Sequence, residues 1–182
     1  MSLATIGTVI TERFEMDYIK FGEGSKKLVI IPGISMHPTV LSAGAVAKSY
    51  LQPFSGYTVF LFDRRKNAAR GYTVEQMAED TAVAMKTVGI SDAYIFGASQ
   101  GGMIAQYLAA RHPELVRGAV LGSSMAYTND YAHSGASHWI NLALEGKVQE
   151  LNYDFFEHLY EPETLEAYKK AFARLSKQGT PE

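Results

Sequence analysis

A serine between closely spaced glycines is the best candidate nucleophile in this sequence. Gly97, Ser99 and Gly101 form the pattern G-x-S-x-G, which stands between a short apolar run and a segment with helical spacing. A sharp turn from strand to helix requires small neighbours, holds the serine in strained backbone geometry and exposes its hydroxyl. The free N–H groups and the dipole at the helix start favour negative charge beside Ser99. The pattern predicts a serine nucleophile, and a glycine-rich turn without chemistry is the alternative.

The composition excludes several other chemistries. The 182 residues include 17 Lys and Arg against 19 Asp and Glu, so a net charge of -2 leaves no basic excess for nucleic acid. The absence of cysteine removes disulfides, thiolate metal sites and a cysteine nucleophile. No His or carboxylate spacing matches a metal-binding helix, and Gly22-Glu23-Gly24 lacks the following helix of a dinucleotide loop. We therefore expect no metal, no cofactor and a small-molecule substrate.

One uncharged run has the length of a membrane span. Residues 93–110 contain no charged side chain, but polar groups and three glycines stand at the centre of the run. Hydrocarbon would penalise those groups, whereas a strand, turn and helix would use them. The first residues show neither a basic region nor an apolar leader. We expect a cytoplasmic protein without a membrane partner.

Two hydrophobic periods alternate along the chain. An apolar helical stripe runs from Val74 to Val88, and Thr73 with Gln76 predicts a capping box at its start. Residues 5–11 and 13–21 alternate with period two, as antiparallel edge strands do. Short continuous apolar runs, typical of parallel strands buried on both faces, occupy residues 27–31, 57–63, 92–97 and 116–122. This pattern predicts an α/β fold with a mostly parallel sheet of about six strands, flanked by helices.

From Met125 onward the strand signal ends and helical spacing remains. The last example is Leu165, Tyr168, Phe172 and Leu175, at spacings of three, four and three. The sequence therefore predicts a helical segment over residues 125–182.

Four segments carry a resemblance to a known family. They are Ile31-Pro32-Gly33-Ile34, Phe62-Asp63-Arg64-Arg65, the turn at Ser99, and the run from Ala110 to Val116. In this order they resemble the α/β-hydrolase superfamily, in particular its single-domain esterases, peptidases and haloperoxidase-like members. The resemblance implies an α/β-hydrolase core over residues 1–124 and a helical cap segment over residues 125–182.

The resemblance also assigns roles to individual residues. Ser99 matches the nucleophile, and the backbone N–H of Gln100 matches one half of the oxyanion hole. The other half would come from Ile34. The family often has His-Gly where this chain has Pro32-Gly33, but a backbone N–H can donate whatever side chain precedes the glycine.

The acid and the base of a triad have no clear counterpart. The family order is Ser, then Asp or Glu, then His, on loops after later strands, and no strand pattern follows residue 122. Thr180-Pro181-Glu182 resembles the start of a helix. We expect a truncated chain whose acid and histidine lie beyond Glu182, with weak activity or none.

The histidines present are weaker candidates. His112 would lie roughly 20 Å from Ser99 along the same helix, at about 1.5 Å per residue. His37 follows the loop after residue 31 and is a candidate for lining the pocket, for the base, or for a local loop contact. The helical segment offers a substitute dyad, or plain packing, from Asp130 with His133, His138 or His158.

Two further groups have both a structural and a functional interpretation. The charged run from Asp63 to Lys66 is typical of solvated or paired residues, although Asp63 with an arginine could brace the loop near the site. Aromatic residues of the helical segment could line an acyl pocket or pack within the cap, namely Tyr153, Phe155, Phe156 and Tyr160.

Two functions remain open from the sequence. One is a serine hydrolase that cleaves a small ester, thioester or amide through an acyl-enzyme on Ser99. The other is a non-catalytic ligand-binding protein that retains the α/β-hydrolase fold. If residues 116–122 form an uncovered sheet edge, we also expect self-association through that edge.

Overall fold

The fold is known from a computed structural model that describes residues 4–34 and 38–166. The chain divides into two compact units, Met1–Ala126 and Tyr127–Glu182. Among the described residues, no helix has both the length and the apolar character needed to cross a membrane.

The first unit is built on a six-stranded sheet with the order β1-β2-β4-β3-β5-β6. The strands are β1 (Thr5–Ile10), β2 (Glu15–Phe21), β3 (Lys26–Ile31), β4 (Tyr57–Arg65), β5 (Ala93–Ala98) and β6 (Val116–Gly122). Strands β1, β2 and β4 pair antiparallel, while β4, β3, β5 and β6 pair parallel. The predicted mostly parallel sheet with an antiparallel N-terminal pair is confirmed.

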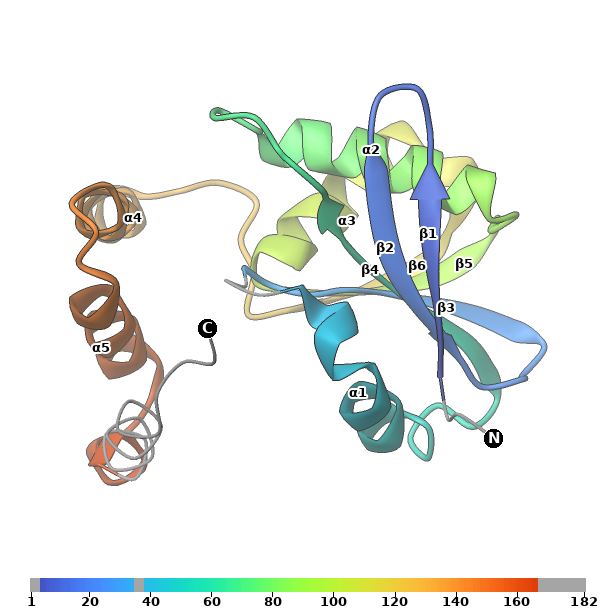
Figure 1. The fold of residues 1–182 in the computed structure, drawn as a ribbon, viewed down its shortest axis with the longest axis horizontal. Helices are drawn as coiled ribbons and strands as arrows, with labels where there is room; N and C mark the ends of the chain where they lie inside the picture. Colours follow the sequence, from blue (N-terminus) through green and yellow to red (C-terminus); the bar gives the residue numbers. More distant parts are fainter. Residues whose placement is uncertain (1–3, 35–37, 167–182) are drawn as a thin grey trace, which may run out of the picture. The chain divides into compact units, whose positions relative to one another are not determined.

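Helices cover both faces of this sheet (Figure 1). The helix α1 (Ala43–Tyr50) packs in one apolar cluster with strand residues such as Val59 and Leu61. The helices α2 (Val74–Thr87) and α3 (Gln100–Arg111) pack in a second cluster, which includes Phe62. Neighbouring residues of β4 therefore enter opposite clusters, because successive side chains of a strand point to opposite faces.

Local signals explain where two of the helices begin and end. Thr73 accepts a hydrogen bond from the Gln76 N–H and the Gln76 side chain accepts one from the Thr73 N–H, which confirms the predicted capping box. Gly89 follows α2 with a φ of 73°, a left-handed conformation that glycine adopts without strain. Pro113 begins a short 3-10 helix after α3, and a proline there prevents α3 from continuing past His112.

Strand β6 lies at the edge of the sheet in the part of the chain that the structure describes. Its residues Val120 and Leu121 are 62% and 45% exposed. Self-association through this edge stays a prediction.

The second unit is helical throughout its described residues, as the sequence predicts. It contains α4 (Asp130–Leu144) and α5 (Val148–Leu159), and residues 162–166 are also helical. The Asn129 side chain accepts from the Ala132 N–H and caps α4. Of the predicted last stripe only Leu165 is described, because Tyr168, Phe172 and Leu175 lie outside the described residues.

Candidate active site

Ser99 stands at the sharp turn between β5 and α3. Its backbone has φ 52° and ψ -120°, a left-handed conformation that a non-glycine residue rarely adopts. The turn is held because the Ser99 N–H donates to the Gly122 carbonyl at 2.8 Å and Ser124 Oγ donates to the Ser99 carbonyl at 2.9 Å. The residue is exposed, and its hydroxyl makes no cap hydrogen bond to α3. The backbone therefore presents this hydroxyl to the surface, as the sequence pattern predicts.

The glycines around Ser99 are required by close backbone contacts. A Cβ on Gly101 would lie 2.6 Å from both the Ile31 carbonyl carbon and the Pro32 oxygen. A Cβ on Gly97 would lie 2.7 Å from the Gly101 carbonyl carbon. Real Cβ atoms essentially never approach other atoms so closely, so the first turn of α3 can rest against β3 and β5 only without these side chains.

The loop after β3 lies directly against the Ser99 side chain. Parallel pairing aligns Ile31 with Gly97, and Gly33 consequently reaches the level of Ser99. A Cβ on Gly33 would lie 3.2 Å from Ser99 Cβ and 3.7 Å from its Oγ. Ile34, the next residue, is 68% exposed. The chain order reverses at β3, between β4 and β5, and crevices at such positions bind ligands in open α/β sheets.

The two residues expected to supply oxyanion donors lie in the segments next to Ser99. Gln100 is the first residue of α3, and the first N–H groups of a helix have no partner within the helix. Ile34 follows Gly33, which packs on the Ser99 side chain. These are the two residues for which the sequence predicts oxyanion donors.

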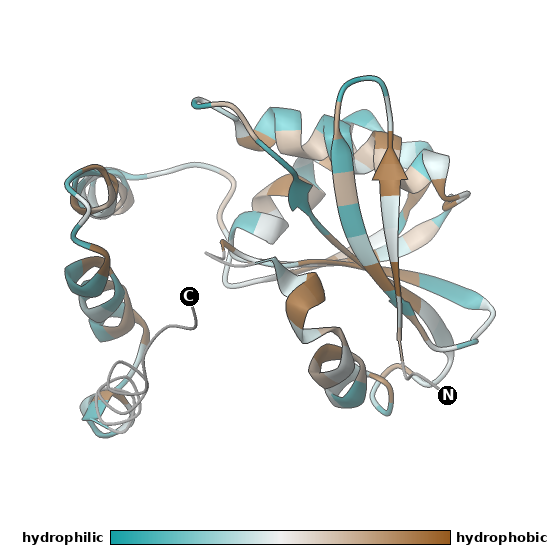
Figure 2. Ribbon diagram, viewed as in Figure 1, coloured by the Kyte–Doolittle hydropathy of each residue, from teal (hydrophilic) through white to brown (hydrophobic). Residues whose placement is uncertain are grey.

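The charged run at the end of β4 is partly buried beside this site. Figure 2 shows the hydrophobic colouring of β4 turning hydrophilic at the tip of the strand. Asp63 is only 8% exposed, and its carboxylate accepts from the N–H groups of Thr39 and Val40 at 2.8 and 3.1 Å. The favoured interpretation of the run as solvated is therefore wrong for Asp63, which instead braces the end of the loop that follows β3.

The rest of the run divides between the site and the surface. Arg64 is half-buried and bonds to the two segments that flank Ser99. Arg65 pairs with Asp80 at 3.5 Å, and Lys66 pairs with Asp17 at 2.9 Å, so the expectation of paired charges is confirmed for these two. Sequence reasoning missed Arg64, because its partners Pro32 and Gln100 are distant in the chain and no local pattern indicates them.

The histidine of α3 has a structural role. His112 lies at the C-terminal end of α3, with Nε2 3.0 Å from Glu79 Oε2 and Nδ1 3.6 Å from Glu114 Oε1. Ser99 and His112 cap opposite ends of this 12-residue helix, which supports the rejection of His112 as the base. His37 lies outside the described residues.

Two of the three histidines of the second unit lie beside Asp154. His138 and His158 lie 3.7 and 3.6 Å from its carboxylate oxygens, and Trp139 Nε1 donates to it at 2.5 Å. For these two the structure favours packing within the helical segment over a dyad with Asp130, because α5 brings Asp154 against the middle of α4, whereas Asp130 is in the first turn of α4. No contact of His133 with Asp130 is among the described interactions.

Three of the four aromatic residues singled out in the helical segment pack within it. Trp139 meets Phe155 edge to face at 4.9 Å, and Phe155, Phe156 and Tyr160 follow as a chain of contacts at 6.4 and 5.8 Å. This supports the packing interpretation for these three, whereas Tyr153 is 39% exposed.

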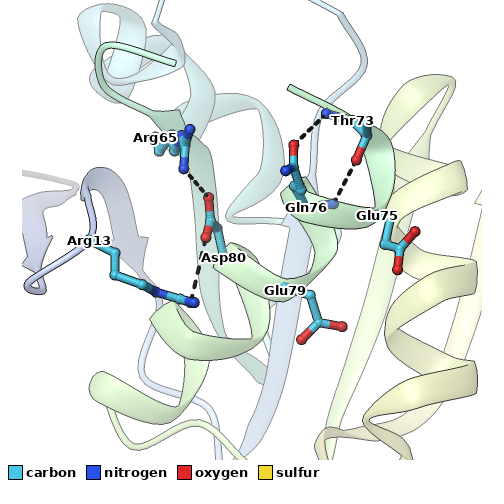
Figure 3. Close-up of a pocket in the computed structure, with 7 residues that line it drawn as sticks. All are labelled: Arg13, Arg65, Thr73, Glu75, Gln76, Glu79 and Asp80. Atoms are coloured by element: carbon cyan, nitrogen blue, oxygen red, sulfur yellow. Dashed lines mark hydrogen bonds and ion pairs between the residues drawn. The ribbon is translucent and has the colours of Figure 1, made fainter. Parts of the chain in front are cut away.

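A polar cavity of about 450 Å³ occupies another part of the first unit (Figure 3). At its base Asp80 is 5% exposed and accepts from Tyr72 Oη at 2.8 Å, with Arg65 at 3.5 Å and Arg13 at 3.9 Å. Burial raises the pKa of Tyr72, the hydrogen bond and the charge of Asp80 raise it further, and the charges of Arg65 and Arg64 oppose this. None of the predicted site residues lines this cavity, whose walls are Arg13, Arg65, Thr73, Glu75, Gln76, Glu79 and Asp80.

The acidic and imidazole side chains do not form a metal centre in the part of the chain that the structure describes. No group of three or more His, Asp or Glu residues is arranged there to hold a metal ion.

The family follows from the fold, the turn at Ser99 and a sequence match. The family profile described as the alpha/beta hydrolase fold matches residues 28–146, which include β3 to β6 and the Ser99 turn. The chain belongs to the α/β-hydrolase fold family.

Individual relatives match over shorter regions. "Putative non-heme bromoperoxidase BpoC" of Mycobacterium tuberculosis is 41% identical over 71 residues, which are 37% of this chain and 27% of that protein. "Uncharacterized hydrolase YraK" of Bacillus subtilis is 37% identical over 67 residues, which are 33% of this chain and 25% of that protein. The matches thus span about a quarter of the curated relatives.

Solved structures share the fold over more of the chain. MGS-M2, an alpha/beta hydrolase enzyme from a deep-sea metagenome library, superposes with a TM-score of 0.79 at 19% identity, over 94% of this chain and 64% of that one. Est816, described as an N-acyl homoserine lactone degrading enzyme, has a TM-score of 0.53 at 26% identity, over 65% of this chain and 45% of that one.

Proposed function

We propose that this protein is a serine hydrolase that cleaves a small ester, thioester or amide through an acyl-enzyme on Ser99. The observation that carries the proposal is the exposed Ser99 at φ 52°, between β5 and α3, with Gly33 packed on its side chain. Strain of this kind persists only where the surrounding structure enforces it, and it clusters at active sites.

The reaction begins with attack of Ser99 Oγ on the carbonyl carbon of the substrate. The C=O π electrons move to the oxygen, and the oxyanion accepts hydrogen bonds from the N–H groups of Ile34 and Gln100. Collapse of the tetrahedral adduct breaks the bond to the leaving group and leaves an acyl-enzyme. Water then attacks the acyl carbon, which releases the acid and restores the serine.

A general base must take the Ser99 proton and return it to the leaving group. His112 is the histidine in the described part of the first unit, and it is held by Glu79 and Glu114 at the far end of α3. We propose that the base and its orienting acid come from outside the described residues. The described residues alone then leave the hydroxyl of Ser99 poorly activated.

An ester is the substrate class with the most support. Est816 is described as a lactone-degrading enzyme, and a lactone is a cyclic ester. The exposed side chain of Ile34 offers an apolar contact beside the Ser99 turn, where an acyl chain would lie.

Covalent labelling tests the proposed nucleophile. A fluorophosphonate present in millimolar excess for hours should add to the chain once, at Ser99, as found by intact mass and peptide mapping. Ser99→Ala should abolish the adduct, whereas Ser49→Ala, which removes an exposed hydroxyl bonded to its own helix, should leave it unchanged.

Two outcomes would contradict the proposal. If no adduct forms at Ser99, the protein is better described as a ligand-binding member of the family. If Ser99 is labelled within seconds at neutral pH, the nucleophile stands but the base is already present in this chain.

A further inference from the structure

The side chain of Arg64 joins the two backbone segments that flank Ser99. Its Nη2 donates to the Pro32 carbonyl at 2.7 Å and to Gln100 Oε1 at 3.1 Å, and its Nε donates to the same Gln100 oxygen at 3.3 Å. Pro32 begins the loop that leads to Ile34, and Gln100 begins α3. One guanidinium therefore bonds to both segments that carry the proposed oxyanion donors.

The register of the sheet explains why this side chain reaches both segments. Strand β4 lies beside β3 with Ile30 opposite Leu61, so the end of β4 runs alongside the loop after β3. The pairing of β4 with β2 shifts register between Phe62 and Arg65, so the end of β4 does not follow simple alternation. Arg64 reaches the first residue of α3, whereas Asp63 reaches the N–H groups of Thr39 and Val40.

The loop after β3 is consequently held from both faces of the sheet. Arg64 holds Pro32 on the α3 side, and Asp63 accepts from the N–H groups of Thr39 and Val40 on the α1 side. Between these anchors Gly33 fits against the Ser99 side chain, where a Cβ would lie 3.2 Å from Ser99 Cβ. So tight a fit at Gly33 leaves little freedom for the N–H of Ile34, the next residue.

The chemistry of this contact favours arginine over lysine. Burial lowers the pKa of Arg64, and the charges of Tyr72 and Asp63 raise it, but a guanidinium stays protonated at any physiological pH. Its planar fork can donate in two directions at once, whereas an ammonium is a point charge on a flexible stem. Both acceptors are neutral oxygens, so the cation strengthens these hydrogen bonds.

We infer that Arg64 is a positioning residue that fixes the Ile34 and Gln100 N–H groups at the spacing needed to bind an oxyanion. It does not touch the reacting atoms and acts through Pro32 and Gln100. The inference rests on the proposed function, because it assigns a role within the same site.

Binding of phenylboronic acid tests this role without requiring turnover. A serine hydroxyl adds to boron to give a tetrahedral anion that imitates the oxyanion adduct. In the 182-residue chain we expect a tetrahedral boron-11 signal in NMR that Ser99→Ala abolishes. Arg64→Met should weaken binding by about 10- to 100-fold and shift bound boron toward the trigonal form, because a misplaced donor costs on the order of one oxyanion contact. Arg64→Lys should weaken binding by less, about 3- to 10-fold.

Two controls separate positioning from folding. Arg117→Met removes an arginine that pairs with Asp92 at the start of β6, and it should change the dissociation constant by less than about twofold. Thermal unfolding establishes that each variant is folded at the temperature of the binding measurement. If Arg64→Met does not fold, Arg64→Lys and Gln100→Met provide the same comparison.

The outcomes distinguish the two claims. If the unmodified chain forms no tetrahedral adduct at Ser99, the proposed function fails and the role of Arg64 fails with it. If the unmodified chain forms the adduct and the folded Arg64 variants form it equally well, only the role of Arg64 is overturned.

Discussion

Two polar regions of the first unit, the network around Asp80 and the turn at Ser99, differ in whether their polar groups are paired. Around Asp80, a buried carboxylate is surrounded by the Tyr72 hydroxyl and two arginines, so charges and hydrogen bonds satisfy one another. At Ser99 the backbone is strained, the residue is exposed and its hydroxyl does not cap the helix that follows. The first arrangement satisfies its polar groups within the fold, whereas the second leaves a hydroxyl exposed, as the proposed nucleophile requires.

The comparison also shows that cavity size alone does not locate the site. The cavity of about 450 Å³ lies over the Asp80 network, and Ser99 is not among its walls. A positive φ alone does not single out Ser99, because Asn67 and Asp92 also have a φ of 52°. The proposal rests on this geometry occurring at an exposed serine directly between β5 and α3.

The largest expected effect is a loss of stability from a substitution in the turn at Ser99. In Gly101→Ala the new Cβ would lie 2.6 Å from the Pro32 oxygen, so β3 and α3 must move apart. We expect a loss of about 3 kcal/mol or more in the free energy of unfolding, measured by urea titration. Gly44→Ala, in α1 with no atom within 4 Å of the added Cβ, should be neutral or stabilise by up to about 1 kcal/mol. Equal losses in the two variants would contradict the close packing inferred at Gly101.

The second-largest expected effect is a loss of stability at Asp80 that leaves the chemistry at Ser99 unchanged. Asp80→Ala removes a buried carboxylate and leaves the half-buried Tyr72 hydroxyl and two arginines without their shared partner, which should cost about 2 to 4 kcal/mol of unfolding free energy. The rate of Ser99 phosphonylation is measured by intact mass at a temperature where the variant is folded. It should stay within about twofold of the rate in the unmodified chain. A lost adduct in the folded variant would show that the Asp80 network belongs to the site after all.

The smallest effect concerns the acid sensitivity of the antiparallel pair β1 and β2. Burial acts to raise the pKa of Asp17, but hydrogen bonds from Thr8 and Lys66 and the charge of Lys66 outweigh it, so the pKa is lowered. The stabilisation is therefore present above the unfolded pKa of about 4 and is lost as pH falls through the folded value. Asp17→Asn should lower the unfolding free energy at pH 7 by about 0.5 kcal/mol, since a partly exposed ion pair contributes little.

The pH series supplies the control for that variant. The difference between Asp17→Asn and the unmodified chain should shrink below about pH 4, when the carboxylate of the unmodified chain becomes protonated. A difference that stays constant down to pH 2 would show that the effect of the substitution is not electrostatic.

Most of the sheet could be predicted from the sequence, because its strands are short apolar runs with clear boundaries. The helix α2 was equally clear, since its capping box and apolar stripe are local signals. The helix α1 was not predicted, because it is only eight residues long and the Ser42 side chain makes no cap hydrogen bond at its start. Its position depends on Asp63, 23 residues after Val40 in the chain, and so on tertiary structure.

The site was predictable where it depends on the backbone and unpredictable where it depends on distant side chains. Ser99 and Gln100 follow from a motif whose glycines are required by local geometry. Arg64 stands in a charged run that usually indicates a solvated surface, and only the pairing of β4 with β3 brings it to Pro32 and Gln100. The general base could not be placed at all, because no local pattern ties a histidine to the Ser99 turn.

The central claim is that the N–H groups of Ile34 and Gln100 donate hydrogen bonds to an oxyanion formed at Ser99. It is tested most directly by the amide proton shifts of these two residues in nitrogen-15 labelled protein, before and after phosphonylation of Ser99. We predict that both amide protons move downfield together, because each donates to the phosphonyl oxygen, and that Ser99→Ala shows no change. If Ser99 carries the adduct and neither amide proton moves, the claim is contradicted.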